Sequence, residues 1–391
     1  MTRRHFLQTT GIALAATWTA LPRKAHAAAP AANVIETRVI SKEPQMYHGW
    51  PTVARRRNGQ LLLVYSGGRE QHVCPFGRVE LMVSPDEGAS WSWPQVLLDG
   101  PTDDRDAGVL ETARGTLLVT TFTSLAYEST LERAAKLKPG APGAWAPARL
   151  AAWQAAHQRL NAEQRQAELG QWMLRSTDAG ISWSARYPTI VNSPHGPTQL
   201  ADGRLLYAGK ELWTEKKRVG VAESTDDGRT WKWLAEIPVR PGDNASEYHE
   251  LHAIETADRR IVAHIRNHNS KNDRETLQTE SADGGRTWSI PRVIGVWGLP
   301  SFLLRLRDDR LLMTYGYRRK PFGNQARISS DHGRTWSEPM TISADGNSGD
   351  LGYPSTVELS DSSLLTIWYE TMAGSPRAVL RQARWRFEEK H

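Results

Sequence analysis

The segment SPDEGASW, residues 84–91, is the first of five copies of the pattern Ser-x-Asp-x-Gly-x-Ser/Thr-Trp. The other copies occupy residues 176–183, 224–231, 281–288 and 329–336. In such a segment the Asp can accept hydrogen bonds from turn N–H groups, the Gly can adopt a positive φ, and the Trp can cover the turn. The first serines lie 92, 48, 57 and 48 residues apart, a spacing typical of repeated blades or solenoid units.

A second repeat falls between the copies of the first and predicts a strand–turn–strand unit. Each copy has alternating apolar residues, a polar turn and a nearly continuous apolar segment. The six copies lie at residues 52–64, 108–119, 198–207, 251–265, 302–315 and 356–368. Six hairpins and five turn motifs predict an all-β fold, a six-bladed β-propeller with four-stranded blades whose last blade lacks the turn motif.

The two ends of the chain are predicted to close the propeller. A strand near residues 378–385 follows the last hairpin, and another strand begins the mature chain near residues 34–37. We expect these two strands to share one blade, because their pairing leaves no open sheet edge.

The spacing of 92 residues exceeds its neighbours by about 40 residues, which predicts an insert in blade two. Residues 125–170 are rich in Ala, Leu, Gln, Glu and Arg and contain a Pro/Gly joint at residues 139–143. This composition favours two helices, near residues 131–136 and 148–169. The helical insert could be a functionless addition or one wall of a binding site.

Residues 1–27 have the features of an export signal. Arg3 and Arg4 precede an apolar segment, and Ala-His-Ala at residues 25–27 resembles a cleavage site. Paired arginines followed by Phe and Leu are typical of a twin-arginine signal peptide. We therefore expect a periplasmic or secreted protein whose mature chain, residues 28–391, is a single propeller domain.

Composition argues against several partner classes. The net charge is +6, but residues 1–27 carry four cations and no acid, which leaves +2 for the mature chain. This charge is too small to predict binding to nucleic acid or to an anionic membrane. No later segment is apolar for long enough to span a bilayer. The single cysteine, Cys74, excludes an intramolecular disulfide and a zinc site built from several thiolates.

Hairpin geometry separates the two faces of the predicted propeller. In an antiparallel hairpin, the first strand begins at the end where the second strand finishes. The turn motifs fall between third and fourth strands, so we expect them on the opposite face, as scaffold. The helical insert follows a second strand and should share the face on which the first strands begin.

Charged and titratable residues are predicted to converge on that face. Counting back 11 residues from each second strand gives one equivalent position per blade: Trp50, Asp106, Pro194, Glu250, Pro300 and Tyr353. Other candidates lie beyond the second strands or nearby: Arg69, Glu70, Arg266, Arg318, His48, His72 and His195. Such a cluster of charged and titratable side chains on one face predicts a site for a polar, anionic, sugar-like ligand. These histidines show no helical metal-ligand spacing, so we expect neither a metal nor a cofactor.

These residues give the chain a resemblance to the sialidase (neuraminidase) superfamily over essentially its whole mature length. The segment DLGYPS at residues 350–355 resembles the nucleophile segment of that family, and Glu250 precedes Arg266 by 16 residues, as a glutamate precedes the second clamp arginine there. Arg318 is similar in placement to the third arginine. The resemblance implies that Tyr353 is a nucleophile activated by Glu250, and that Arg266 and Arg318 hold a substrate carboxylate. It further implies a retaining exo-glycosidase that acts on a terminal acidic sugar, sialic acid or a related one.

The chain departs from the family pattern in two places. The segment YHGWP, residues 47–51, stands where the family has the segment with its first arginine, and no aspartate occupies the place of the acid/base residue in blade one. Asp106, His72 and Glu70 are the candidates for this proton transfer, which typically contributes about 10²–10⁴-fold to the rate. Arg69, His48, His195 and Trp50 are predicted to contact the substrate.

Two other functions fit the same sequence. A glycosidase or polysaccharide lyase on this scaffold could act on a non-sialic sugar and move protons with histidines such as His48 and His72. A non-catalytic carbohydrate-binding propeller would need only stacking surfaces and hydrogen bonds. In all three cases the expected partner is a carbohydrate.

Overall fold

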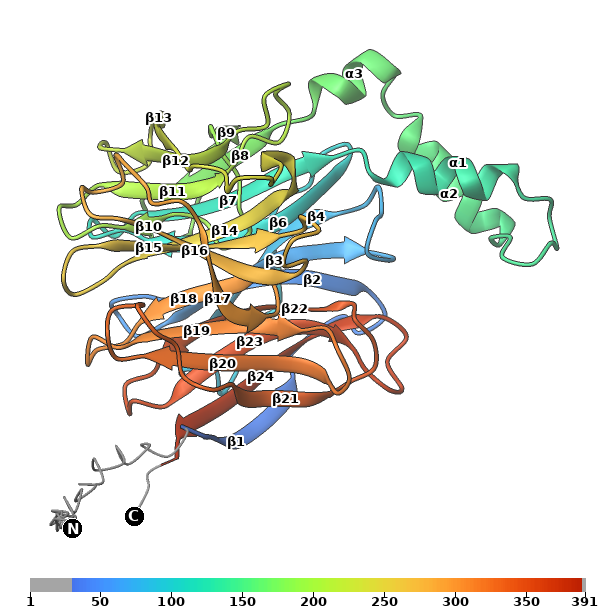
Figure 1. Cartoon of the computed structure of the whole chain (residues 1–391). Coiled ribbons are helices and arrows are strands. Elements are labelled where there is room, and N and C mark those ends of the chain that lie inside the picture. Colours follow the sequence, from blue (N-terminus) through green and yellow to red (C-terminus); the bar gives the residue numbers. More distant parts are fainter. Residues whose placement is uncertain (1–29, 389–391) are drawn as a thin grey trace, which may run out of the picture.

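The computed structural model describes residues 30–388 and contains six four-stranded antiparallel sheets arranged as blades (Figure 1). The six-bladed β-propeller predicted from the repeats is therefore confirmed. The predicted export signal at residues 1–27 lies outside the described residues.

The strands follow the predicted order, with the first strand of each blade innermost. Blade one contains β2 (Tyr47–Arg55), β3 (Leu61–Arg69), β4 (Arg78–Ser84) and β5 (Gln95–Leu98). Blade two contains β6 (Asp103–Glu111), β7 (Leu117–Ser124), β8 (Gln171–Ser176) and β9 (Tyr187–Pro188). Blade three contains β10 (Thr198–Gln199), β11 (Leu205–Lys210), β12 (Val219–Ser224) and β13 (Lys232–Glu236).

The second half of the propeller repeats this pattern. Blade four contains β14 (Tyr248–Glu255), preceded by a 3₁₀ turn at Ala245–Glu247, then β15 (Ile261–Asn267), β16 (Glu275–Ser281) and β17 (Arg292–Trp297). Blade five contains β18 (Ser301–Arg305), β19 (Leu311–Tyr317), β20 (Phe322–Ser329) and β21 (Met340–Gly346). Blade six contains β22 (Leu351–Glu358), β23 (Leu364–Thr371), β24 (Ala378–Phe387) and β1 (Ala32–Val39).

The ends of the chain close the ring as predicted. Strand β1 pairs antiparallel with β24, from Ala32 opposite Phe387 to Val39 opposite Arg381. The second strands are apolar over most of their length because both of their faces pack against neighbouring blades; β3 and β11 are buried throughout. A propeller closed in this way leaves only short, protected sheet edges.

The five turn motifs form identical hydrogen-bonded turns between third and fourth strands. In the third copy, Ser224 Oγ donates to Asp226 Oδ1 at 2.8 Å, and Gly228 N donates to Ser224 Oγ at 2.9 Å. Thr230 donates from its backbone N to Asp226 Oδ1 at 2.9 Å and from its Oγ1 to Oδ2 at 2.6 Å. The Gly adopts a φ of +80°, which a residue with a Cβ rarely does. The motif is a structural turn, as predicted.

Replacing Asp226 with Ala is expected to lower the free energy of unfolding by about 1–2 kcal/mol, because three donors lose their shared acceptor. Urea unfolding measures the change. Asp273→Ala is the matched control, since Asp273 is exposed and, among residues 30–388, forms an ion pair with Arg274 alone, at 3.5 Å. Equal stability of the two variants would show that the turn motif does not stabilise its blade.

The insert in blade two leaves the propeller body as a helical protrusion (Figure 1). It contains α1 (Tyr127–Lys136), α2 (Pro147–His157) and α3 (Ala162–Ala167), between β7 and β8. The prediction of two helices was wrong, because the second predicted helix is broken. Asn161 caps α3 by accepting from Gln164 N at 2.9 Å, and the Gln164 side chain accepts from Asn161 N at 2.9 Å.

The insert packs on blade one through its own small core. Tyr127, Leu131 and Trp153 are buried together with Cys74, which lies in the loop after β3. In the part of the chain that the structure describes, no helix has the length and apolar character needed to cross a membrane.

Candidate active site

Three predicted residues from blades four and six meet in one hydrogen-bonded group. Tyr353 in β22 donates from its Oη to Glu250 Oε1 in β14 at 2.7 Å. Arg266 in β15 donates from one nitrogen, Nη1, to Glu250 Oε1 at 2.8 Å and to Tyr353 Oη at 3.0 Å. The propeller thus brings a phenol, a carboxylate and a guanidinium into direct contact, although 103 residues separate Glu250 from Tyr353.

A bulge at the same position of several first strands aims these side chains at the axis. The pairing register skips two residues in β2, β6, β14 and β22, and the skipped pairs contain Trp50, Asp106, Glu250 and Tyr353, respectively. Trp50, Asp106 and Tyr353 adopt positive φ values of 53°, 46° and 51°. Non-glycine residues rarely adopt this conformation, and bulges of this kind re-aim side chains next to active sites.

The electrostatics of the group keep the carboxylate charged and the phenol neutral. Burial alone would raise the pKa of Glu250, but Arg266, His249 and the bond from Tyr353 lower it to about 2. Burial and the Glu250 carboxylate hold the pKa of Tyr353 well above its ordinary value. At neutral pH the pair therefore consists of a protonated nucleophile and an adjacent base.

Asp106 lies beside this group and is nearly buried, with 6% of its surface exposed. Burial raises the pKa of its carboxyl to about 7; Arg105 opposes this shift and Glu250 adds to it. A carboxyl with this pKa can give or take a proton near neutral pH, which suits it to the predicted acid/base role.

The Asp106→Asn variant is expected to change the pH dependence of stability. The pKa of Asp106 in the fold lies above its ordinary value, so this carboxyl destabilises the wild type as pH rises from about 4 to about 7. Between pH 4 and pH 8 the variant should therefore gain about 3–4 kcal/mol relative to the wild type. Urea unfolding at several pH values measures this difference, and a difference that does not vary with pH would contradict the assignment.

Two further arginines lie near the group. Arg318 donates from Nε to Leu351 O at 3.0 Å, and its guanidinium carbon lies 5.8 Å from the centre of the Tyr353 ring. Arg105 lies over the Trp50 ring at 4.6 Å, and its nearest acid is Asp103 at 3.9 Å. Arg105 was not predicted, although its place directly before the bulge residue Asp106 was a usable signal.

Trp50 and His195 were predicted to contact the ligand, and the structure buries both next to Tyr353. The ring centres of Trp50 and His195 each lie 6.4 Å from that of Tyr353. Burial lowers the pKa of His195 to about 3, so this imidazole is neutral. Its Nδ1 lies 3.3 Å from Thr52 Oγ1.

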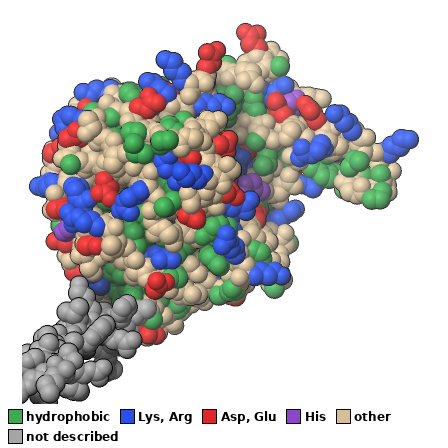
Figure 2. Space-filling view, viewed as in Figure 1, with side chains coloured by type: hydrophobic (Ala, Val, Ile, Leu, Met, Phe, Trp, Pro, Cys, Tyr) green, Lys and Arg blue, Asp and Glu red, His purple; other side chains and the backbone are tan. Residues whose placement is uncertain are grey.

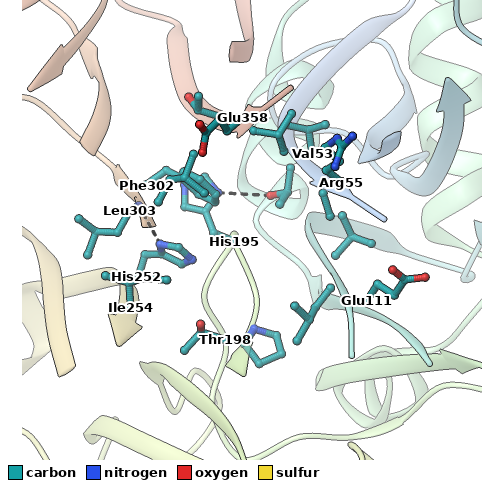
Figure 3. A pocket seen from close by; sticks show the side chains of 18 of the residues that line it. Val53, Arg55, Glu111, His195, Thr198, His252, Ile254, Phe302, Leu303 and Glu358 are labelled. Atoms are coloured by element: carbon teal, nitrogen blue, oxygen red, sulfur yellow. Dashed lines mark hydrogen bonds between the residues drawn. The ribbon is translucent and has the colours of Figure 1, made fainter. Parts of the chain in front are cut away.

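His195 also lines a cavity on the opposite face of the propeller (Figure 3). This cavity of about 450 Å³ lies between the ends of the first strands, on the face of the turn motifs. His195, His252 and Phe302 are among the residues that line it. The rings of His252 and Phe302 are stacked, with 4.6 Å between their centres. The cavity is separate from the predicted site on the opposite face.

Three predicted site residues make structural contacts in the fold: the predicted ligand contacts Arg69 and His48, and the proton-transfer candidate Glu70. Arg69 is fully buried, forms an ion pair with Asp103 and donates to the His72 carbonyl at 2.8 Å. Glu70 accepts from Arg149 Nε at 3.0 Å and from Trp153 Nε1 at 2.9 Å, so it holds the helical insert.

His48 is the third of these residues. It is buried against Tyr65, with 5.4 Å between the ring centres, and burial lowers its pKa to about 4. Among the described residues, it shares no hydrogen bond or ring contact with Tyr353, Glu250 or Arg266.

His72, in contrast, is half-exposed and belongs to a second polar group next to Trp50. Its Nδ1 lies 2.9 Å from Asp350 Oδ1, and its ring centre lies 4.9 Å from that of Trp50. Asp350 also accepts from Tyr47 Oη at 3.0 Å and from Tyr369 Oη at 3.1 Å. Asp350 was quoted in the sequence only as the first residue of the Tyr353 segment, and its role as a shared acceptor was missed.

Comparisons with known proteins agree with this architecture. The model of the BNR repeat-like domain family matches residues 144–367. The structure is similar to a protein of unknown function from Dyadobacter fermentans DSM 18053, with a TM-score of 0.72, 24% identity, and coverage of 92% of this chain and 100% of the other. No curated protein sequence matches the chain.

Two sialidases are also similar. The Hadza microbial sialidase Hz136 has a TM-score of 0.60 and 17% identity, with 86% of this chain and 65% of that chain covered. The Trypanosoma rangeli sialidase in complex with the inhibitor DANA has a TM-score of 0.57 and 15% identity, with 86% and 55% covered. The chain thus spans about half to two thirds of the length of these sialidases, and it shares their propeller fold.

Proposed function

Because the chain belongs to the BNR repeat-like domain family and has a sialidase-like propeller, we propose that it is an exported exo-glycosidase. Its proposed substrate is a glycan with a terminal acidic sugar, sialic acid or a related one. The observation that carries this proposal is the contact of Tyr353 Oη with both Glu250 and Arg266. The proposed export to the periplasm or the medium rests on the sequence of residues 1–27 alone.

In the first step, Tyr353 Oη attacks the anomeric carbon and passes its proton to Glu250 Oε1. The distance of 2.7 Å between these oxygens suits direct transfer. A neutral phenol suits a sugar that carries a carboxylate next to the reacting carbon, since a charged carboxylate nucleophile would be repelled. The bond to the leaving oxygen breaks as the bond to Tyr353 forms, so the configuration inverts once.

In the second step, water attacks the same carbon and the Tyr353 oxygen leaves with the proton that Glu250 returns. The configuration inverts again, and the net result is retention. The leaving oxygen in the first step and the water in the second need a proton partner, for which Asp106 and His72 are the candidates within the site.

Arg266 and Arg318 are proposed to hold the carboxylate of the sugar. Arg266 uses Nη1 and Nε for bonds within the protein, and in residues 30–388 its Nη2 has no hydrogen-bond partner. In the part of the chain that the structure describes, Arg318 forms one hydrogen bond, from Nε to the Leu351 carbonyl oxygen. Guanidinium groups with free N–H donors form charge-assisted bonds to carboxylates, which gives both affinity and orientation.

The test is a screen of 4-methylumbelliferyl glycosides with the purified mature protein. The panel contains an α-sialoside, glucuronides and neutral hexosides. Hydrolysis of an acidic glycoside, with product of retained configuration by NMR, is the expected result. Cleavage of neutral hexosides alone, or no hydrolysis at all, would reject the proposal.

A further inference from the structure

A groove of about 470 Å³ lies between the helical insert, the loop after β3 and the end of blade six. Thr130 and Arg133 of α1 form one wall, and Arg377 lies on the other with Thr371. His72 and Asp350 belong to the same lining. Figure 2 shows charged and histidine side chains gathered in the recess where the helical protrusion meets the propeller body.

A layer of buried aromatic rings lies between the groove and the Tyr353 site. The Tyr47 ring lines the groove and lies 6.1 Å from the Trp50 ring and 6.1 Å from the Tyr369 ring. Trp50 and Tyr369 in turn lie 6.4 Å and 6.0 Å from Tyr353. The groove is thus one ring layer away from Tyr353, and a ligand seated on Tyr353 would reach it by extending along these rings.

Hydrogen bonding fixes the roles of the two nitrogens of His72. Asp350 stays ionised, since its bonds with His72, Tyr47 and Tyr369 outweigh burial and lower its pKa. An ionised carboxylate only accepts hydrogen bonds, so the proton between Asp350 Oδ1 and His72 Nδ1 belongs to Nδ1. His72 Nε2 is then the working nitrogen, and in the described part of the chain it has no hydrogen-bond partner.

We propose that this groove binds the leaving sugar of the substrate, and that His72, oriented by Asp350, transfers the proton to and from the glycosidic oxygen. This inference rests on the proposed glycosidase function and assigns its missing proton partner. An exo-glycosidase seats the terminal sugar on the buried nucleophile, so the leaving part must extend toward the open side. His72 lines that open side, whereas Asp106 is nearly buried and does not line the groove.

The proton and electron balance closes over the two steps. First, the bond from the anomeric carbon to the leaving oxygen breaks, its electron pair stays on that oxygen, and the oxygen takes the proton of protonated Nε2. The Tyr353–carbon bond forms, and Glu250 takes the phenol proton. Then neutral Nε2 removes a proton from the attacking water, Glu250 returns its proton to Tyr353, and both residues regain their starting states.

The groove also indicates the class of leaving group. Among residues 30–388, Arg133 donates to Thr130 Oγ1 alone, at 3.0 Å, and neither Arg133 nor Arg377 has an acid within ion-pair distance. Of the two acids in the lining, Glu70 pairs with Arg149, and Asp350 is shared by His72 and two tyrosines. The unpaired charge of the groove is therefore positive, and an acidic sugar is the leaving group that it favours.

The experiment compares two leaving groups on the same acidic sugar. The 4-methylumbelliferyl glycoside has a leaving group that departs without protonation, whereas the methyl glycoside needs an acid. His72→Ala is expected to lower the rate constant of the first step by about 10²–10⁴-fold on the methyl glycoside and by less than about tenfold on the activated glycoside, where the burst of released 4-methylumbelliferone measures it. His332→Ala, in a turn motif on the opposite face, is the matched control.

Asp350 is proposed as a positioning residue, so its variants should follow the same leaving-group pattern. Asp350→Asn is expected to lower kcat on the methyl glycoside with little change in KM, and Asp350→Glu to restore part of the loss. Arg133→Ala should raise KM several-fold for a substrate with an acidic leaving sugar and leave the methyl glycoside unaffected. Arg159→Ala, an exposed arginine of the same insert outside the groove, is its control.

The outcomes separate this inference from the function on which it rests. If the wild type hydrolyses acidic glycosides but Asp106→Asn, instead of His72→Ala, shows the leaving-group dependence, His72 is not the proton donor. Equal losses of the first-step rate constant on both substrates in His72→Ala would also overturn the inference and leave the glycosidase intact. Failure of the wild type to hydrolyse any acidic glycoside rejects the proposed function, and the inference with it.

Discussion

Replacing Tyr353 with Phe is expected to lower kcat on the best acidic glycoside by at least about 10³-fold, because the reaction loses its nucleophile. The fold should remain intact. Glu250 and Arg266 keep their own contact at 2.8 Å, and the variant loses one hydroxyl with its two hydrogen bonds. We expect the free energy of unfolding to fall by about 1–2 kcal/mol.

Steady-state kinetics and urea unfolding of the same preparations measure this prediction. Tyr187→Phe is the matched control, because Tyr187 also donates its hydroxyl once, to Gly228 O, but lies at a turn motif away from the site. The control should lose some stability and no activity. A Tyr353→Phe enzyme with near wild-type kcat would exclude the nucleophile role, and an unsaturated sugar product would then indicate a lyase that depends on His72.

Replacing Arg266 with Ala is expected to have the largest effect on stability, about 3–5 kcal/mol at pH 7. The ion pair with Glu250 is largely buried, and removal of one partner leaves an uncompensated charge in the interior. The same change removes a donor to Tyr353 and the proposed substrate clamp, so KM for acidic glycosides should rise as well.

The pH dependence identifies Glu250 as the group responsible. The pKa of Glu250 in the fold, about 2, lies below its ordinary value, so the wild type carries stability from this carboxylate above about pH 4.5. This stability is lost as pH falls toward 2, and the difference between wild type and Arg266→Ala should shrink over that range. Arg305→Ala breaks an exposed pair with Asp309 and should cost less than about 1 kcal/mol. Equal costs for the two variants would contradict the account.

The architecture was predictable because repeats constrain it many times over. Five turn motifs and six hairpins each specify a blade, and an integral number of blades must close into a ring. The Tyr353, Glu250 and Asp106 positions were predictable for the same reason, since one count along each first strand finds the bulge that carries them. The spacing of the repeats therefore predicts which residues of the first strands lie in the candidate site.

The residues around the Tyr353 group were less predictable, because side chains from other blades and from the insert fix their orientation. Arg69 and Glu70 are adjacent in sequence, but Arg69 forms an ion pair with Asp103 of blade two. Glu70 forms an ion pair with Arg149 of the insert. No local pattern distinguishes such residues from ligand contacts. The same holds for Asp350, whose three donors come from two blades and one loop.

In the helical insert, amino-acid composition predicts helices but not where they begin and end. Residues 148–169 contain strong helix formers throughout, yet the chain ends one helix at His157 and begins another at Ala162. The reciprocal bonds of Asn161 and Gln164 stop the first helix from continuing. The break was visible in the sequence as a capping box, Asn followed by Gln three residues later.

The most direct test of the account is to trap the covalent intermediate on Tyr353. Incubation with 2,3-difluorosialic acid, or the fluorinated analogue of another acidic sugar whose glycoside the wild type hydrolyses, should add one sugar mass to the intact protein. Peptide mass spectrometry should place the adduct on Tyr353, and Tyr353→Phe should remain unmodified. An adduct on another residue, or continued hydrolysis with no adduct on Tyr353, would contradict the central claim.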